Sequence, residues 1–272
     1  MPKTRLHFNQ LSSVEGISRL STDAIVLVHG WACSAQDWSE FEEPLARLAP
    51  VITLDLRGHG RSEIASDGRY SPHAMADDLI CLLDHLLLRR VILIAHSAGA
   101  EVAASVAVRH AERVDALIAV DPAFGLTQSD LGRLAASSER FAVEDPLAVV
   151  VEYFANFPEE TAALTARHRE SALGARPDVV RAMFDEFAFG PESLRFRPET
   201  DHFLARRAAP ILGIYAREER ARQAAELLAR PGDRVLTYAG SGHWPHQQHA
   251  DRFLADVVEW LADIGLVKTE HE

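Results

Sequence analysis

Short apolar runs recur along the chain, and the stretches between them place apolar residues on one side of a helix and charged residues on the other. Short apolar runs are typical of buried strands, and amphipathic stretches are typical of helices that cover a sheet. The expected strands are residues 24–28, 51–54, 91–95, 116–120, 211–215 and 235–238. The expected helices are residues 38–48, 73–88, 98–110, 220–228 and 247–261. Strands that alternate with helices predict an α/β fold with a doubly wound, mostly parallel sheet.

The alternation stops between residues 122 and 207, where the pattern is helical and contains no convincing strand. Nine of the chain's twelve phenylalanines fall in this stretch. Most of these rings are expected to pack within the stretch itself, and a few to face the sheet edge. We therefore expect a core formed by residues 1–121 and 208–272, with a helical cap, or lid, inserted as residues 122–207 between two late strands.

Composition narrows the class of protein and its partners. The chain has 272 residues, 47% of them hydrophobic, which suits a large globular core. A net charge of -12 argues against nucleic acid and anionic membranes, because both reward a basic surface, and favours a small neutral or cationic substrate. The beginning of the chain lacks the apolar stretch of a secretory signal, and no later run is long enough to cross a bilayer.

We therefore expect a cytoplasmic protein, of an oligomeric state that the sequence does not indicate. Its two cysteines, Cys33 and Cys81, are expected to be free thiols, because a single disulfide in a large unsecreted chain is rare.

The segment Ala95-His96-Ser97-Ala98-Gly99 lies between an expected strand and an expected helix. A serine on a sharp strand-to-helix turn presents its hydroxyl at the carboxyl edge of a sheet, near the backbone N–H groups of the helix start. Serine at this place can also serve merely as a helix cap, but the small residues Ala95 and Gly99 suit a crowded turn. Ser97 is therefore predicted to be a nucleophile.

A serine nucleophile needs a base, and the base needs an acid that orients it. His243 follows the last expected strand in the loop Gly240-Ser241-Gly242-His243, whose glycines permit a tight turn, and is the predicted base. Asp121, directly after the strand at 116–120, is the favoured acid, and Glu219, after the strand at 211–215, is the rival. Asp121 could instead cap a turn before Pro122. His246 and His249 are expected at the surface.

Acyl transfer at a serine also needs hydrogen-bond donors for the oxyanion. The N–H of Ala98, after the nucleophile, is the first candidate, and the N–H of Trp31, in Val28-His29-Gly30-Trp31, is the second. The Trp31 ring is expected to form part of the pocket wall. His29 could act as another base, but a role in holding the turn through hydrogen bonds is favoured.

Four motifs in this order resemble the α/β-hydrolase family, over residues 24–265. The motifs are His29-Gly30-Trp31, Asp55-Leu56-Arg57-Gly58-His59-Gly60-Arg61-Ser62, Ala95-His96-Ser97-Ala98-Gly99 and Gly242-His243-Trp244-Pro245. They are specific for the fold and not for a substrate. The resemblance implies a structural turn at residues 57–62, with no catalytic role for His59. In the family the acid commonly lies in a longer loop after the strand at 211–215, so the short loop before Glu219 favours Asp121, the position used by some members.

The favoured function is hydrolysis of an ester or lactone of a small, mainly apolar or aromatic substrate, with no metal or organic cofactor. The resemblance also leaves open cleavage of a carbon–carbon bond, as in meta-cleavage hydrolases. Through His29-Gly30-Trp31, His96-Ser97 and Asp121, the chain also resembles the cofactor-free dioxygenases that open hydroxyquinolone rings on this fold. That resemblance implies a histidine and aspartate pair as base, with a serine that only binds the substrate. Ala98 and Cys33 stand where that group carries histidines, which argues against it. A receptor without catalysis would not need to retain both Ser97 and His243.

Overall fold

A single sheet of seven strands forms the centre of the protein, and its strand order is β1-β3-β2-β4-β5-β6-β7. The strands are β1 (Phe8–Leu11), β2 (Ala24–Val28), β3 (Val51–Leu54), β4 (Val91–His96), β5 (Val114–Val120), β6 (Ile211–Tyr215) and β7 (Arg234–Thr237). All neighbouring pairs are parallel except β1 and β3, which are antiparallel. The computed structural model describes residues 4–13, 18–157 and 161–268. The predicted doubly wound, mostly parallel sheet is confirmed.

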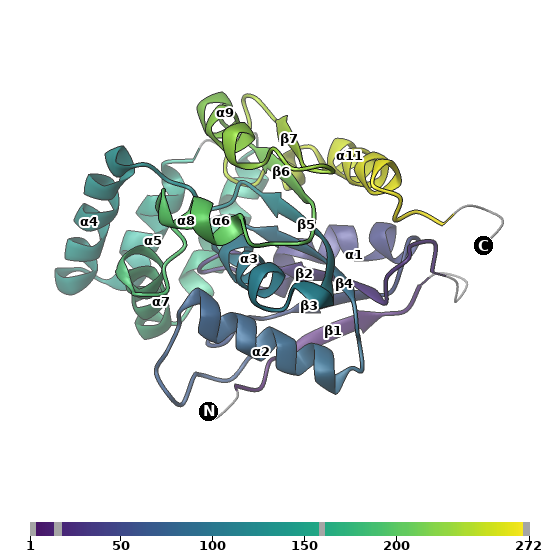
Figure 1. Cartoon of the computed structure of the whole chain (residues 1–272). Helices are drawn as coiled ribbons and strands as arrows, with labels where there is room; N and C mark the ends of the chain where they lie inside the picture. The colour runs from purple at the N-terminus through teal and green to yellow at the C-terminus, as the bar shows by residue number, and fades with distance from the viewer. Residues whose placement is uncertain (1–3, 14–17, 158–160, 269–272) are drawn as a thin grey trace.

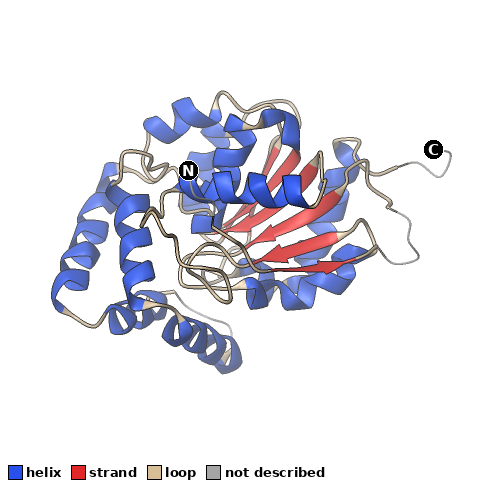
Figure 2. Ribbon diagram, turned by 90° about the horizontal axis from the view of Figure 1, so that it is seen from below, coloured by secondary structure: helices blue, strands red, loops and turns tan. Residues whose placement is uncertain are grey.

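Helices cover both faces of the sheet, so its central strands are buried on both sides (Figure 2). On one face, α1 (Ser39–Ala46) and α11 (Ala250–Asp263) enclose Phe41, Trp260 and the strand residues that point toward them. On the other face, α2 (Pro72–His85) and α3 (Ala98–Arg109) pack against the remaining strand side chains. This two-sided burial explains why the strands of the core appear in the sequence as continuous apolar runs.

Two differences from the predicted elements have physical reasons. Strand β1 was not expected, because two of its four residues, Asn9 and Gln10, are polar and most of the strand is exposed at the edge of the sheet. The expected helix at 247–261 divides into α10 (Pro245–Gln248) and α11, which are separated at His249.

The helix α9 (Glu218–Leu227) packs along β6 and β7, near the edge of the sheet opposite β1.

Between β5 and β6, the described residues form five helices, at the place where the alternation of strands and helices stops. They are α4 (Gln128–Val143), α5 (Pro146–Ala155), α6 (Ala162–Gly174), α7 (Pro177–Phe189) and α8 (Glu199–Leu204). Helices of this group lie beyond the carboxyl ends of the parallel strands, beside the core (Figure 1 and Figure 2). Within the described ranges, none of the protein's helices combines the length and apolar character that a membrane span requires.

Candidate active site

The turn between β4 and α3 holds the backbone of Ser97 in a conformation that residues other than glycine rarely adopt, with φ 53° and ψ −121°. The Ser97 backbone N–H donates to the Val120 carbonyl oxygen at 2.9 Å, which fixes the turn against the end of β5. A Cβ at Gly99 would lie 2.3 Å from the His29 carbonyl oxygen. The small residue expected at position 99 is therefore required by the backbone that passes beside it.

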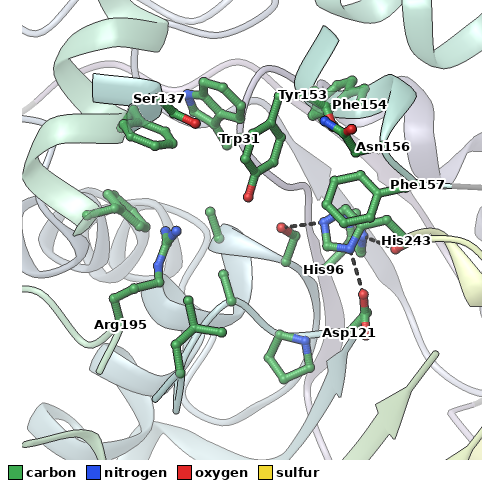
Figure 3. A pocket seen from close by; sticks show the side chains of 18 of the residues that line it. Trp31, His96, Asp121, Ser137, Tyr153, Phe154, Asn156, Phe157, Arg195 and His243 are labelled. Carbon is green, nitrogen blue, oxygen red and sulfur yellow. Dashed lines mark hydrogen bonds and ion pairs between the residues drawn. The ribbon is translucent and has the colours of Figure 1, made fainter. Parts of the chain in front are cut away.

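His243 contacts both Ser97 and Asp121 (Figure 3). Its Nε2 lies 2.8 Å from the Ser97 hydroxyl oxygen, and its Nδ1 lies 2.6 Å from Asp121 Oδ2. The other oxygen of Asp121 accepts a hydrogen bond of 3.2 Å from the Ala216 backbone N–H, which follows β6. The three side chains come from the ends of β4, β5 and β7, and the parallel sheet brings these ends to one edge.

Glu219, the rival acid, lies away from this group. It stands in the first turn of α9, which begins at Glu218, only three positions beyond the end of β6 at Tyr215. Its exposed carboxylate accepts a hydrogen bond of 3.4 Å from the Gln223 side chain, one turn further along the helix. The loop is too short to carry Glu219 across to His243, so the structure brings Asp121 to the imidazole.

Trp31 lines the same cavity as Ala98. The Trp31 indole N–H donates to the Val180 carbonyl oxygen at 2.8 Å, which anchors the ring against α7. Across the described part of the chain, no protein acceptor takes the backbone N–H of either Trp31 or Ala98. Both N–H groups are thus available to a ligand at the mouth of the Ser97 turn.

The interpretation of His29 as a residue that holds the turn is confirmed. Its Nδ1–H donates to the Gly30 carbonyl oxygen at 2.7 Å, and its Nε2 accepts from the Leu56 N–H at 2.9 Å. Burial lowers the pKa of His29. Both ring nitrogens are occupied, so His29 has no free nitrogen for a reaction.

The expectation of a surface position for His246 is wrong. Its side chain is completely buried, with the ring centroid 4.6 Å from that of Trp38 and 5.5 Å from that of Phe41. Neither ring nitrogen has a hydrogen-bond partner among the described residues. Because α11 packs on the sheet face that holds α1, the short α10 before it is buried as well.

A cavity of about 430 Å³ opens beside Ser97. Its aromatic wall consists of Trp31, Tyr153, Phe154, Phe157, Phe184, Phe187 and Trp244. Phe157 stacks on the His243 ring, with centroids 4.5 Å apart and an interplanar angle of 22°. The Tyr153 hydroxyl points into the cavity from the side opposite Asp121 (Figure 3). The segment at 122–207 therefore contributes several of the rings that surround the reactive hydroxyl.

The sequence patterns did not single out several polar residues of this cavity, among them Tyr153, Asn156 and Arg195. Tyr153 lies on α5, in the stretch that was expected only to be helical, and a helical pattern does not show which side chains face a cavity. Where the structure describes the chain, no group of three or more His, Cys, Asp or Glu side chains could hold a metal ion. Cys33 and Cys81 are free, as expected.

The family model for the α/β-hydrolase fold matches residues 23–187 of this chain. The chain belongs to the α/β-hydrolase fold family. Its relatives within the family carry names of several kinds. Over 143 residues, about half of each chain (51% and 52%), it is 33% identical to a putative 2-succinyl-6-hydroxy-2,4-cyclohexadiene-1-carboxylate synthase of Bacillus subtilis (strain 168).

Two further proteins match nearly the whole chain. A 2-hydroxymuconate semialdehyde hydrolase of Pseudomonas sp. (strain CF600) is 24% identical over 253 residues, which cover 88% of this chain and 87% of the relative. The crystal structure of the enol-lactonase from Burkholderia xenovorans LB400 has a TM-score of 0.77 and 22% identity, with 95% of this chain and 97% of the other covered. The shared fold thus extends over the core and the helices between β5 and β6.

Proposed function

We propose that this α/β-hydrolase cleaves an ester or lactone of a small substrate through a triad of Ser97, His243 and Asp121. The observation that supports this proposal is the chain of two hydrogen bonds, 2.8 Å from Ser97 to His243 and 2.6 Å from His243 to Asp121. A hydroxyl, an imidazole and a carboxylate in this order are the groups that activate a serine for acyl transfer. The names of the relatives, which include hydrolases and a lactonase, agree with it.

In the proposed reaction, the Ser97 oxygen attacks the carbonyl carbon while its proton passes to His243 Nε2. Asp121 accepts the Nδ1–H of His243, keeps the imidazole in the required tautomer and stabilises the imidazolium that forms. The negative charge on the former carbonyl oxygen is stabilised by the backbone N–H groups of Trp31 and Ala98, which act as the oxyanion hole.

Collapse of the tetrahedral intermediate breaks the bond to the leaving oxygen, which takes the proton from His243 Nε2. The acyl group remains bonded to the Ser97 oxygen. A water molecule, deprotonated by the same nitrogen, then attacks this acyl-enzyme and releases the acid, and the proton returns to Ser97. Water is the only co-reactant that this sequence of steps requires.

The helices at 122–207 act in this proposal as a cap that covers the substrate. Phe154, Phe157 and Phe184 of this segment line the cavity beside Ser97, and Trp31 completes the apolar wall from the core. Apolar walls of this kind bind the hydrocarbon part of a substrate and exclude water from the reacting bond. The substrate is therefore small, and one side of it is apolar or aromatic.

A fluorophosphonate probe tests the proposal, because it phosphonylates serines that a base has activated. The wild-type protein, Ser97→Ala and the control Ser66→Ala, which removes an exposed serine outside the cavity, are compared by mass spectrometry. We expect one adduct in the wild type and in Ser66→Ala, and none in Ser97→Ala. Labelling that persists in Ser97→Ala would show that the activated group is elsewhere.

Turnover of small esters and lactones is then measured with and without dissolved oxygen. The hydrolase proposal expects equal rates in both conditions, and a loss of at least ~10⁴-fold in Ser97→Ala. Turnover that requires oxygen and survives Ser97→Ala would instead assign the His243 and Asp121 pair to a cofactor-free oxygenation.

A further inference from the structure

The charge of the cavity is opposite to the charge of the chain. The whole protein has 40 Asp and Glu against 28 Lys and Arg. Among the residues that the structure describes, the lining of the cavity includes four arginines and one carboxylate, which is Asp121. The arginines are Arg133, Arg195, Arg217 and Arg220. The net charge of the chain led us to expect a neutral or cationic substrate. The lining of the cavity, with four arginines and one carboxylate, does not support that expectation.

The four arginines differ in what they contact. Arg220 donates to the carbonyl oxygens of Phe124 and Gly125, at 2.7 and 2.6 Å, and so holds the chain after β5. Arg133 donates to Asp130 and to the Tyr153 hydroxyl, both at 3.2 Å. Arg217 is exposed. Arg195 and Arg220 are both buried, with 6% and 8% of the residue exposed, but both Nη atoms of Arg220 already donate to carbonyl oxygens.

Arg195 is held in one position by both its backbone and its side chain. The Leu126 N–H donates to the Arg195 carbonyl oxygen at 2.7 Å. The Arg195 Nε and Nη2 atoms both lie 2.8 Å from the same oxygen of Glu101, which is fully buried on α3. Such a residue is preorganised, because little side-chain entropy remains to be lost when a ligand binds.

Part of the guanidinium is left for a ligand. Within the described residues, no protein group accepts a hydrogen bond from Arg195 Nη1, and Figure 3 shows the guanidinium directed into the cavity from the side opposite His243. The second carboxylate oxygen of Glu101 also has no partner there. Burial raises the pKa of Glu101 to about 7, although Arg195 opposes this shift.

The position of Glu101 sets the distance to the reacting atoms. Glu101 follows Ser97 by four residues on α3, which is about one helical turn, or roughly 6 Å along the axis. Arg195, which contacts Glu101, therefore lines the same cavity as Ser97 from a neighbouring part of the wall. The planar fork of a guanidinium matches the two oxygens of a carboxylate better than it matches a single neutral acceptor.

We propose that Arg195 binds a carboxylate of the substrate, so that the enzyme acts on esters or lactones that carry a carboxylate a few bonds from the reacting carbonyl. This inference rests on the proposed function, since it places a second anchor in the same cavity. The aromatic wall holds the apolar part of the substrate, and Arg195 fixes the direction in which the substrate lies across Ser97.

Two small esters of equal shape test the inference. Monomethyl glutarate carries a carboxylate, and methyl 4-carbamoylbutanoate carries a neutral amide in its place. Binding to Ser97→Ala, which cannot turn them over by the proposed reaction, is measured by calorimetry, and methanol release is measured with the wild type. We expect 10- to 100-fold tighter binding and a 10- to 100-fold higher kcat/KM for the carboxylate, as for a charge-assisted hydrogen bond. Arg195→Met, alone and in the Ser97→Ala background, should lose this preference, and the single variant should retain fluorophosphonate labelling.

The control is Arg197→Met, on the same segment, whose guanidinium pairs with Asp201 and Glu226 outside the cavity and whose loss should leave the preference unchanged. If Arg195→Met does not fold because Glu101 loses its partner, the double variant Arg195→Met, Glu101→Gln removes both charges and is used instead. Equal binding of the two esters, or a preference that survives both variants, overturns this inference alone. Absence of fluorophosphonate labelling in the wild type would instead count against the proposed triad.

Discussion

Nε2 of His96 lies 2.7 Å from the backbone carbonyl oxygen of His243. Because a carbonyl oxygen only accepts, His96 carries its proton on Nε2. Burial is the main cause that holds the pKa of His96 well below its usual value, and the neighbouring His243 lowers it further. His96, which is neutral and directly precedes Ser97, therefore holds the backbone of His243, and His243 in turn contacts the Ser97 hydroxyl.

His96→Phe should lower kcat by about 10- to 100-fold, because loss of this hydrogen bond frees the His243 loop and small displacements of a base are costly. His96→Gln can still donate through its amide and should recover most of the rate. Steady-state kinetics with thermal unfolding of both variants checks this. If both variants lose the same activity, the hydrogen bond is not the cause.

The two candidate acids are distinguished by paired amide substitutions. Asp121→Asn should reduce kcat by about 10⁴-fold, because an amide favours the wrong tautomer of His243. Glu219→Gln should remain within about two-fold of the wild type, since the Glu219 carboxylate is exposed and contacts only Gln223 in the described chain. A large loss of rate in Glu219→Gln alone would transfer the orienting role to that residue.

Two glycines in helices should respond in opposite ways to alanine. A Cβ at Gly99 would lie 2.3 Å from the His29 carbonyl oxygen and 2.9 Å from that of Val28, so Gly99→Ala should destabilise the fold by more than about 2 kcal/mol, as overpacking does, and displace Ser97. A Cβ at Gly132, on α4, would meet nothing within 4 Å, so Gly132→Ala should stabilise the fold by about 0.5 to 1 kcal/mol. Denaturant unfolding measures both, and equal effects would contradict the steric argument.

Acid should destabilise the protein through its buried histidines. Burial lowers the pKa of His59 to about 3 and that of His246 well below its usual value. The pKa values of these histidines in the unfolded chain are near 6.5, so below that pH the unfolded chain binds more protons than the folded protein does. The free energy of unfolding therefore falls as pH decreases from about 6.5 toward 3. Denaturant unfolding between pH 8 and pH 4 should show this slope.

His246→Phe removes two buried nitrogens without partners and should raise the free energy of unfolding at pH 7 by about 1 to 2 kcal/mol. It should also reduce the dependence on acid, because one group that titrates on unfolding is gone. His202→Phe, at an exposed histidine, is the control and should leave the slope as it is in the wild type. An unchanged slope in His246→Phe would show that this ring does not contribute.

The sheet could be predicted because its central strands are buried on both faces. The runs at 24–28 and 91–95 contain only apolar residues, since both sides of each strand contact helices. Strand β1 was missed for the opposite reason, because an exposed edge strand carries little apolar signal. The residues proposed for catalysis could be located from the ends of predicted strands, because parallel strands bring these ends to one edge.

The polar part of the cavity wall and the buried position of His246 could not be predicted in the same way. Glu101 is a lone acid in the apolar stretch 98–107, which could have indicated a buried partner, but nothing in the sequence links it to Arg195, 94 residues later. His246 was misplaced because a polar side chain after a loop is most often exposed. The contact between Glu101 and Arg195 depends on how the inserted segment packs on the core. The burial of His246 depends on how α10 packs against Trp38 and Phe41, and local patterns encode neither arrangement.

His168 of α6 stacks on Trp244, the neighbour of His243, with ring centroids 3.7 Å apart and an interplanar angle of 16°. The inserted helices thus contact the loop that carries the imidazole, because His168 lies against the residue that follows His243. Displacement of α6 from the core would remove a ring that packs one position from the proposed base.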